Sequence, residues 1–398
     1  MFHFRALIFL IVCICCHSGW ANTADLERLD SFVAHRNSYI TAKQLRIDKI
    51  KQQLHNAHTP QQQLALYDRI YEEYYTFRFD SAMAYVKRGA ELAQRSKNSL
   101  FITKFRIHRS LLLATSGYYS QAEAILKSIQ PDSLPNSLKF KYYYSITWLY
   151  NFWSAYCDDQ EFAPQFNQLR LNYLQQTIQY CPQGSAMRHY LTGEALFYSN
   201  HNVESMKYYQ RVLQQVGINN RLYASSAYAL ARCYKALGRT DMYEHYMVQA
   251  GISDQVCPLK ENLALQELSL YLYEKDGNYS GRAVKYIYCS MEDAQFYNNR
   301  LRMLEISRIL PKIVAAYQSQ LNTRTTLLYW GLGGMSLLTL MLVALIVFAY
   351  KQNKKLNLRR LQLHQKNKLL EELNHKMRET NKKRETYMRL FIDISAIY

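Results

Sequence analysis

Five cysteines outside the N-terminal segment are the first residues whose spacing suggests chemistry. Cys157 and Cys181 are 24 positions apart, and so are Cys233 and Cys257, a separation at which two antiparallel helices can bring thiols together as a disulfide. Cys289 makes the number odd, so at least one thiol stays unpaired in an oxidising compartment. Because a free cysteine packs as a small apolar residue, we favour buried thiols in a helical core, and two disulfides remain the alternative.

The other residue types that carry chemistry do not form recognisable sites. None of the 11 histidines lies in an HExxH pair or at a spacing that joins it to a cysteine in a zinc site. The sequence has no GxSxG nucleophile elbow and no P-loop, and we expect Asp158, Asp159 and Glu161 to form a solvated turn. We therefore predict no catalytic residue, no metal site, no cofactor and no enzymatic activity, with an enzyme of unrecognised type as the alternative.

The C-terminal run LFIDISAIY, residues 390–398, resembles the start of the phosphoacceptor box of sensor histidine kinases. In that box a histidine follows the serine directly, because its imidazole accepts the phosphoryl group. Here Ala396 follows Ser395, and no Gly-rich ATP-binding segment comes after it. The sequence therefore does not predict a working kinase.

Helices are the elements that must position all of these residues. Only 13 glycines and 7 prolines occur among 398 residues, which is well below their average share of about 12% and leaves few turn residues for a sheet-rich fold. Hydrophobic residues make up 49% of the chain, enough to bury a large core. The composition predicts a mostly helical, well-folded protein.

A helical repeat fills most of the chain. The segment Leu111–Pro131 has the residue order of the second half of a tetratricopeptide unit, with a turn glycine at Gly117, and Leu230–Ala250 has the same order around Gly238. In such units a small residue lets two helices approach and a large one fills the next groove. The residues two positions after each turn are separated by 40, 43, 41, 37 and 39 residues and are Phe79, Tyr119, Phe162, Val203, Thr240 and Tyr279. Because this period exceeds the usual tetratricopeptide length of about 34, we expect extended helices or loops, and a HEAT-like array is the alternative.

Tyrosines gather within this repeat, as in Tyr71–Tyr75 and Lys141–Tyr144. We expect most of them to fill the core between helices. The alternative is a tyrosine-lined concave face that binds peptide or glycan, since a solenoid provides such a surface.

Two segments indicate export and a membrane anchor. In residues 1–21, Arg5 precedes an apolar run, and Gly19 and Ala21 stand at the −3 and −1 positions of a signal-peptidase site. We predict a signal peptide cleaved after Ala21, with an uncleaved anchor as the alternative.

The second apolar segment, residues 327–350, is a transmembrane prediction. Its 24 residues make a helix of about 36 Å, longer than the hydrocarbon core of about 30 Å. Only Arg324 flanks its N-terminal side, whereas basic residues crowd the other side, namely Lys351, Lys354, Lys355, Arg359 and Arg360. The positive-inside rule therefore places the C-terminus in the cytoplasm and the repeats in the periplasm.

Helical stretches flank the repeats, which we assign to residues 59–324. An opening helix within residues 22–58 has apolar residues that we expect to point inward, namely Leu29, Phe32, Val33, Tyr39, Ile40, Leu45 and Ile47. The closing stretch, Met291–Gln320, is expected to be helical with an interruption at Pro311, and it leads into the membrane. Since no flexible Gly/Ser linker intervenes, a tilt or rotation can pass along it.

The tail, residues 351–398, holds 13 Lys/Arg and 5 Asp/Glu, which is +8 of the formal charge of +18. A strongly basic chain raises nucleic acid as a partner, but basic residues beside the membrane also fit the anionic inner leaflet. A weak heptad pattern runs through Leu356, Leu363, Leu370 and Met377. We predict a short cytoplasmic coiled coil that can align two chains as a parallel homodimer.

The whole layout resembles a Bacteroidetes family of membrane-anchored tetratricopeptide-type transcriptional regulators with a C-terminal domain of unknown function. The resemblance lies in the opening helix LERLDSFVAHRNSYITAKQLRIDKIKQQL and in the run after the membrane segment, where the matching residues are Leu373, Asn374, Asn381, Arg384, Glu385, Tyr387, Phe391, Ser395 and Tyr398. It implies a regulatory role and no catalytic residue. Family members continue into a further cytoplasmic domain, whereas this sequence ends at Tyr398, so we do not expect nucleic acid as a partner of this chain.

Taken together, the sequence predicts an all-α protein with a tetratricopeptide-like helical-repeat solenoid, one transmembrane helix and a short cytoplasmic coiled-coil helix. We expect an inner-membrane sensor whose periplasmic repeats bind a protein, peptide or glycan-related cue and relay it through the membrane helix. A non-enzymatic envelope scaffold that gathers partner proteins is the alternative. The ligand-binding residues and the downstream target are not indicated.

Overall fold

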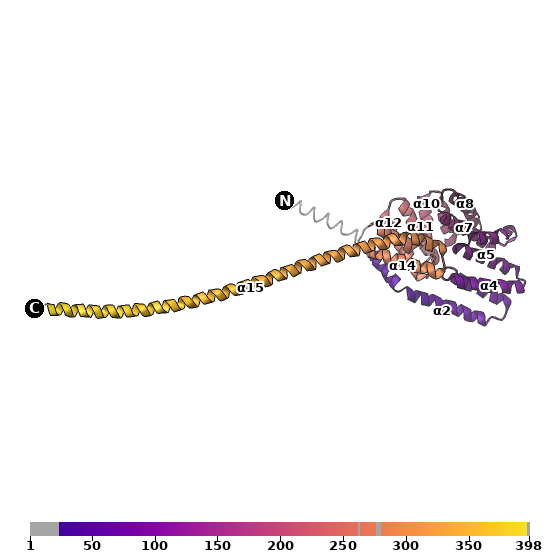
Figure 1. The fold of residues 1–398 in the computed structure, drawn as a ribbon. Helices are drawn as coiled ribbons and strands as arrows, with labels where there is room; N and C mark the ends of the chain where they lie inside the picture. Colours follow the sequence, from indigo (N-terminus) through magenta and orange to yellow (C-terminus); the bar gives the residue numbers. More distant parts are fainter. Residues whose placement is uncertain (1–23, 262, 276–279, 396–398) are drawn as a thin grey trace. The chain divides into compact units, whose positions relative to one another are not determined.

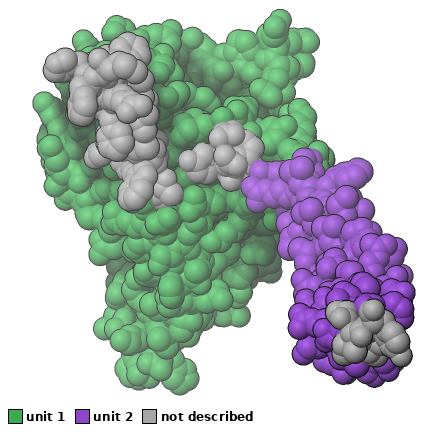
Figure 2. Space-filling model, turned by 90° about the vertical axis from the view of Figure 1, so that its left-hand side faces the viewer, with its two compact units in different colours: residues 1–319 green, residues 320–398 purple. Residues whose placement is uncertain are grey.

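The computed structural model describes residues 24–395 except 262 and 276–279. It divides into two compact units, residues 1–319 and residues 320–398, which are coloured separately in Figure 2. The predicted signal peptide, the marker Tyr279 and the kinase-box position Ala396 lie outside the described residues.

The described residues are helical apart from turns (Figure 1). A first helix covers residues 24–34. The others follow in the order α2 Arg36–His55, α3 Pro60–Tyr74, α4 Phe79–Arg95, α5 Ser99–Thr115, α6 Tyr119–Lys127, η1 Pro131–Ser133, α7 Asn136–Cys157, α8 Ala163–Tyr180, α9 Ala186–Tyr198, α10 Asn202–Gln215, α11 Arg221–Ala236, α12 Thr240–Val256, α13 Ala264–Lys275, α14 Ser280–Tyr297 and α15 Arg300–Ser395.

Helices α3 to α14 pack in consecutive pairs as hairpins, α3 with α4 through to α13 with α14. In the first five pairs the second helix begins at a predicted repeat marker or one residue away, at Phe79, Tyr119, Ala163, Asn202 and Thr240. Gly117 and Gly238 turn the chain before two of these helices with φ of 86° and 72°, a region that glycine adopts without steric cost. The prediction of an all-α repeat is confirmed.

Small residues bring the helices of a hairpin together, as the sequence predicts. Ala82, Ala122 and Ala250 are fully buried. Gly193 of α9 lies against Tyr209 of α10 so closely that an added Cβ would be 2.6 Å from the tyrosine ring. Such close approach explains why a small residue recurs at these positions.

The opening segment differs from the single helix we expected. The helix over residues 24–34 ends at a turn at His35, and α2 starts at Arg36. Leu29 and Ile47 are fully buried, whereas Leu45 is 60% exposed, so the inward prediction for Leu45 is wrong. Ile47 lies two positions further along α2, and residues two apart on a helix point in nearly opposite directions.

These two helices join opposite ends of the repeat array. Leu29 packs beside Gly251 of α12, and Asp30 accepts hydrogen bonds from Arg282 and Lys285 of α14 at 2.8 and 2.9 Å. Farther along, Arg46 of α2 holds Glu73 of α3 in a two-bond ion pair.

Pro311 does not interrupt the closing stretch; it lies inside α15. The break falls earlier, at Asn298, whose φ is 69°. A proline within a helix costs about 3 kcal/mol. Ile306 and Ile313, on either side of it, are fully buried in the core of the repeats, and burying each such side chain contributes about 1.5–3 kcal/mol, which offsets the cost of the proline.

The repeat array closes on itself. The backbone N–H of Lys260, between α12 and α13, donates to the carbonyl of Thr76, between α3 and α4, at 2.9 Å. The hydroxyl of Tyr297, at the end of α14, donates to the carbonyl of Tyr75 at 2.6 Å. Tyr297 is fully buried, and that burial raises the pKa of Tyr297 well above its usual range. The first hairpin is thus tied to the last.

We expect Tyr297→Phe to lower the free energy of unfolding by about 1–3 kcal/mol, because it leaves the buried Tyr75 carbonyl without a donor. Thermal unfolding of the purified protein measures this. Tyr288→Phe, on the exposed side of the same helix at 47% exposure, is the matched control and should change little. Equal effects of the two variants would contradict the closure contact.

We expect Gly193→Ala to destabilise the protein by about 1–3 kcal/mol through overpacking against Tyr209. Gly281→Ala is the control, because its added Cβ meets only an ordinary contact of 3.7 Å to Tyr317 and alanine favours a helix over glycine. In thermal unfolding, Gly193→Ala should therefore have a clearly lower melting temperature than Gly281→Ala. A neutral Gly193→Ala would show that α10 can move away at little cost.

Candidate ligand-binding site

A cavity of about 1070 Å³ lies within the closed array. Its walls come from α5, α7, α8, α9, α11 and α13, from Asp254 of α12 and from the first turns of α15, with Tyr75 at one edge. These helices are mainly the first helices of successive hairpins, so the cavity is the inner face of the solenoid. A volume of this size admits a small organic ligand.

Aromatic side chains make up much of the cavity wall. They stand at intervals along α7, α9 and α11 and include Tyr144, Trp148, Phe152, Tyr190, Tyr198 and Tyr228. Burial raises the pKa of Tyr190 well above its usual range, so this phenol stays neutral. The tyrosine alternative of the sequence analysis thus has a counterpart in the structure, although Tyr71 and Tyr74 fill the core as we expected.

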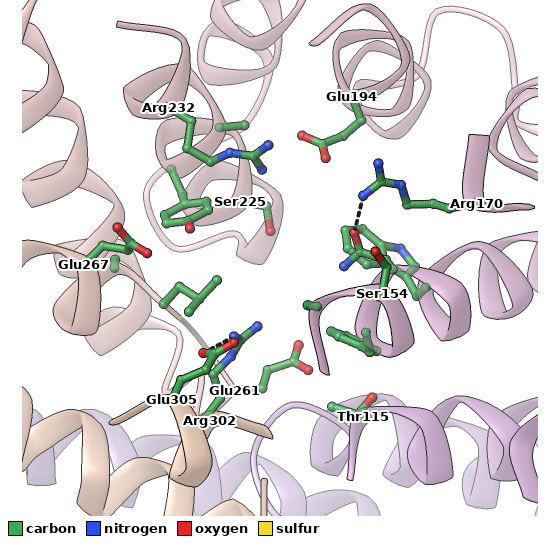
Figure 3. A pocket seen from close by; sticks show the side chains of 18 of the residues that line it. Thr115, Ser154, Arg170, Glu194, Ser225, Arg232, Glu261, Glu267, Arg302 and Glu305 are labelled. Carbon is green, nitrogen blue, oxygen red and sulfur yellow. Dashed lines mark hydrogen bonds and ion pairs between the residues drawn. The ribbon is translucent and has the colours of Figure 1, made fainter. Parts of the chain in front are cut away.

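Carboxylates at one end of the cavity are paired with arginines. Glu261 accepts from Arg221 at 2.6 Å. Glu305 accepts from Arg302 of the same helix, α15, at 2.6 Å, and from Gln266 of α13 at 3.1 Å. Figure 3 shows Glu261, Arg302 and Glu305 together there. These bonds tie α15 to α13 at the cavity wall.

The opposite end of the cavity holds Arg170, Glu194 and Arg232, which point toward one another from different helices (Figure 3). Arg170 donates to Asn151 at 3.1 Å, and Glu194 accepts from Tyr209 at 2.6 Å. No sequence motif marks this group, because its members come from α8, α9 and α11.

A protein-family model described as the SusR N-terminal TPR domain matches residues 33–308. The chain belongs to this family. The match covers more than two thirds of the sequence and includes α3 to α14 and the cavity-lining residues Arg302, Glu305 and Arg308 of α15. It favours tetratricopeptide over HEAT-like repeats and is consistent with a non-enzymatic regulatory protein. No curated protein matches the chain.

The SusR-type domain also gathers three groups that could ligate a metal, Asp68, Glu72 and His108, a cluster that the sequence analysis missed. His108 donates from Nε2 to Asp68 at 2.7 Å, and burial lowers the pKa of His108. Lys104 donates to Asp68 at 3.0 Å and Lys141 to Glu72 at 2.7 Å. Because two ammonium groups already neutralise these carboxylates, we interpret the cluster as an ion-pair network between α3, α5 and α7.

The cysteines of the described residues are free thiols. Cys181, Cys233 and Cys289 are buried, as the sequence analysis favoured, whereas Cys157 and Cys257 are only partly buried. Cys233 lies beside Ser205 at 3.2 Å, whereas Cys257 lies 3.7 Å from the carbonyl of Ile218. Burial raises the pKa of Cys257 to about 11.

Asp159, in the turn after α7, accepts from the backbone N–H groups of Glu161 and Phe162, so the predicted turn is present, at the edge of the cavity.

Asp254 of α12 is a buried carboxyl in the cavity wall. Burial, together with the charges of Asp293 and Glu261, raises the pKa of Asp254 well above its usual range. A carboxyl with a raised pKa takes up a proton on folding. Its contribution to stability is therefore fully present below the pKa of an unfolded Asp, about 3.9, and is lost as the pH rises through the folded pKa.

We expect Asp254→Asn to raise the free energy of unfolding at pH 7 by about 1 kcal/mol or more, and this gain to shrink as the pH falls toward 4. Thermal unfolding across this pH range measures it. Asp241→Asn, on the same helix but 65% exposed at its side chain, is the matched control and should show no such dependence. A destabilised Asp254→Asn at pH 7 would contradict the assignment.

Proposed function

We propose that this chain is a single-pass inner-membrane regulatory protein whose repeats bind a cue in the cavity and whose α15 helix relays it. In this proposal residues 1–21 are a signal peptide, residues 22–58 and 59–324 form the periplasmic sensing region, residues 327–350 cross the membrane, and residues 351–398 are cytoplasmic. Membership of the SusR N-terminal TPR domain family supports a regulatory role.

One observation carries the proposal: α15 takes part in the cavity and also contains the membrane-length apolar segment. Arg302, Glu305, Arg308 and Ile309 of α15 line the cavity. Within the described residues, α15 is the one helix long and apolar enough to cross a membrane, and its apolar window is wholly exposed. A ligand that shifts the first turns of α15 acts on the same continuous helix that enters the bilayer, so a two-state movement can bias both ends.

The exposed side chains of α15 fit this role. The large apolar residues from Leu327 to Tyr350 are about half exposed or more. Exposure of these side chains to water is unfavourable, and insertion into a bilayer would remove that free-energy cost. Tyr329, Trp330 and Tyr350 stand at the two ends of the segment, where amphipathic rings prefer the membrane interface. The excess of basic residues after Tyr350 supports a cytoplasmic C-terminus.

The cytoplasmic helix supplies the output in this proposal. Every side chain described from residue 351 to residue 393 is exposed, including the heptad residues Leu356, Leu363 and Leu370. Pairing of two chains along this row would form a parallel homodimer. Cytoplasmic partners would then respond to rotation of the two paired helices or to a change in the distance between them.

Alanine insertions after Leu321 test the relay. Two inserted residues rotate everything beyond them by about 200°, whereas seven return it to within about 20° of the original phase. In cells deleted for the gene, we expect the seven-residue variant to restore the wild-type transcript profile during nutrient shifts and the two-residue variant to fail. Membrane levels of both variants are the control.

A passive scaffold is the second candidate, because tetratricopeptide repeats generally bind proteins. A scaffold tolerates both insertions and also an unrelated anchor in place of residues 325–398. Equal function of all these variants would refute the relay and favour the scaffold.

A further inference from the structure

The Arg170 and Arg232 guanidiniums lie at one end of the cavity and approach it from different helices (Figure 3). The guanidinium carbon of Arg170 is 3.4 Å from the ring centre of Tyr198, and that of Arg232 is 5.4 Å from the same ring. The tyrosine ring therefore lies within cation–π distance of both cations. These stacking contacts orient the arginines but do not neutralise them.

Neither arginine has a carboxylate within 4 Å among the residues that the structure describes. Arg170 is only 8% exposed, and its Nε hydrogen has no acceptor. The indole N–H of Trp148, in the same wall, also lacks an acceptor. Arg302, at the other end of the cavity, also has an Nε hydrogen without an acceptor. However, Arg221 and Arg302 each have a carboxylate partner at 2.6 Å, so what distinguishes Arg170 and Arg232 is the missing carboxylate.

The local charge is positive. Glu194 is the carboxylate that points toward the two arginines, and its Oε1 already accepts from Tyr209. Two guanidiniums against one carboxylate leave about one unit of positive charge in a largely desolvated place. Burying an uncompensated charge is costly, and a bound monoanion would remove that cost. A dianion such as phosphate fits less well, because Glu194 would repel its second charge.

We propose that the ligand of this cavity carries a carboxylate, which binds between Arg170 and Arg232, on a ring-bearing body that stacks on the aromatic wall. The guanidinium fork matches the two oxygens of a carboxylate. This inference rests on the proposed function in taking the cavity as the sensing site.

Matched acids and neutral analogues test the inference on the full chain in detergent micelles. N-acetyl-phenylalanine and its amide represent a peptide source of the carboxylate, and glucuronate and glucose represent a sugar-acid source. We expect one acid to raise the melting temperature and to bind by calorimetry, with affinity at least about tenfold above that of its neutral analogue. The pair that responds identifies the source.

Arg170→Gln and Arg232→Gln should each weaken binding of that acid by about tenfold or more, while Arg211→Gln, on the exposed face of α10, should leave it unchanged. Both cavity variants should melt at or above the wild-type temperature without ligand, because each removes a guanidinium that has no carboxylate partner within 4 Å. Arg170→Lys, which keeps the charge but loses the fork, should bind more weakly than wild type.

Three results would overturn the inference: binding of neither acid, equal binding of acid and neutral analogue, or retained affinity in the glutamine variants. A large fall in melting temperature of those variants without ligand would instead assign the arginines a structural role and also overturn it. The insertion series after Leu321 uses no added ligand, so a failed relay and a failed carboxylate site are distinguishable.

Discussion

The closed helical array depends on the contact between its first and last hairpins. Tyr297 donates its hydroxyl to the carbonyl of Tyr75, and Lys260 donates its backbone N–H to Thr76. The inner helices of the closed array line the cavity. Because α15 begins three residues after Tyr297, the same contact also fixes where the last helix starts.

The first turns of α15 extend this arrangement. Burial of Ile306 and Ile313 holds them in the core of the repeats despite Pro311, and the bonds from Arg302 and Gln266 to Glu305 join them to the cavity wall. The charged lining is divided: the arginines beside α15 have carboxylate partners, and the arginines at the other end have no carboxylate within 4 Å among the described residues. A ligand that spans the cavity would connect the arginine end with the helix proposed to carry the signal.

Local patterns explain which features could be predicted. The turn glycines, the small residues at helix contacts and the repeat markers depend on neighbours within one hairpin, so the sequence places the second helices within one residue of their observed starts. The errors arise where distant residues decide. Leu45 is exposed because Ile47, on the opposite side of α2, is the residue that the array buries. Pro311 remains within a helix because buried isoleucines on both sides stabilise it.

The sequence by itself determined the helical class, the period of the repeat, the apolar segment of membrane length and the positive charge beyond it, because each is a property of adjacent or regularly spaced residues. Only the tertiary structure decided the closure of the array, the cavity and the meeting of Arg170, Glu194 and Arg232. Those side chains come from three helices in different hairpins, and no local spacing records how a solenoid curves.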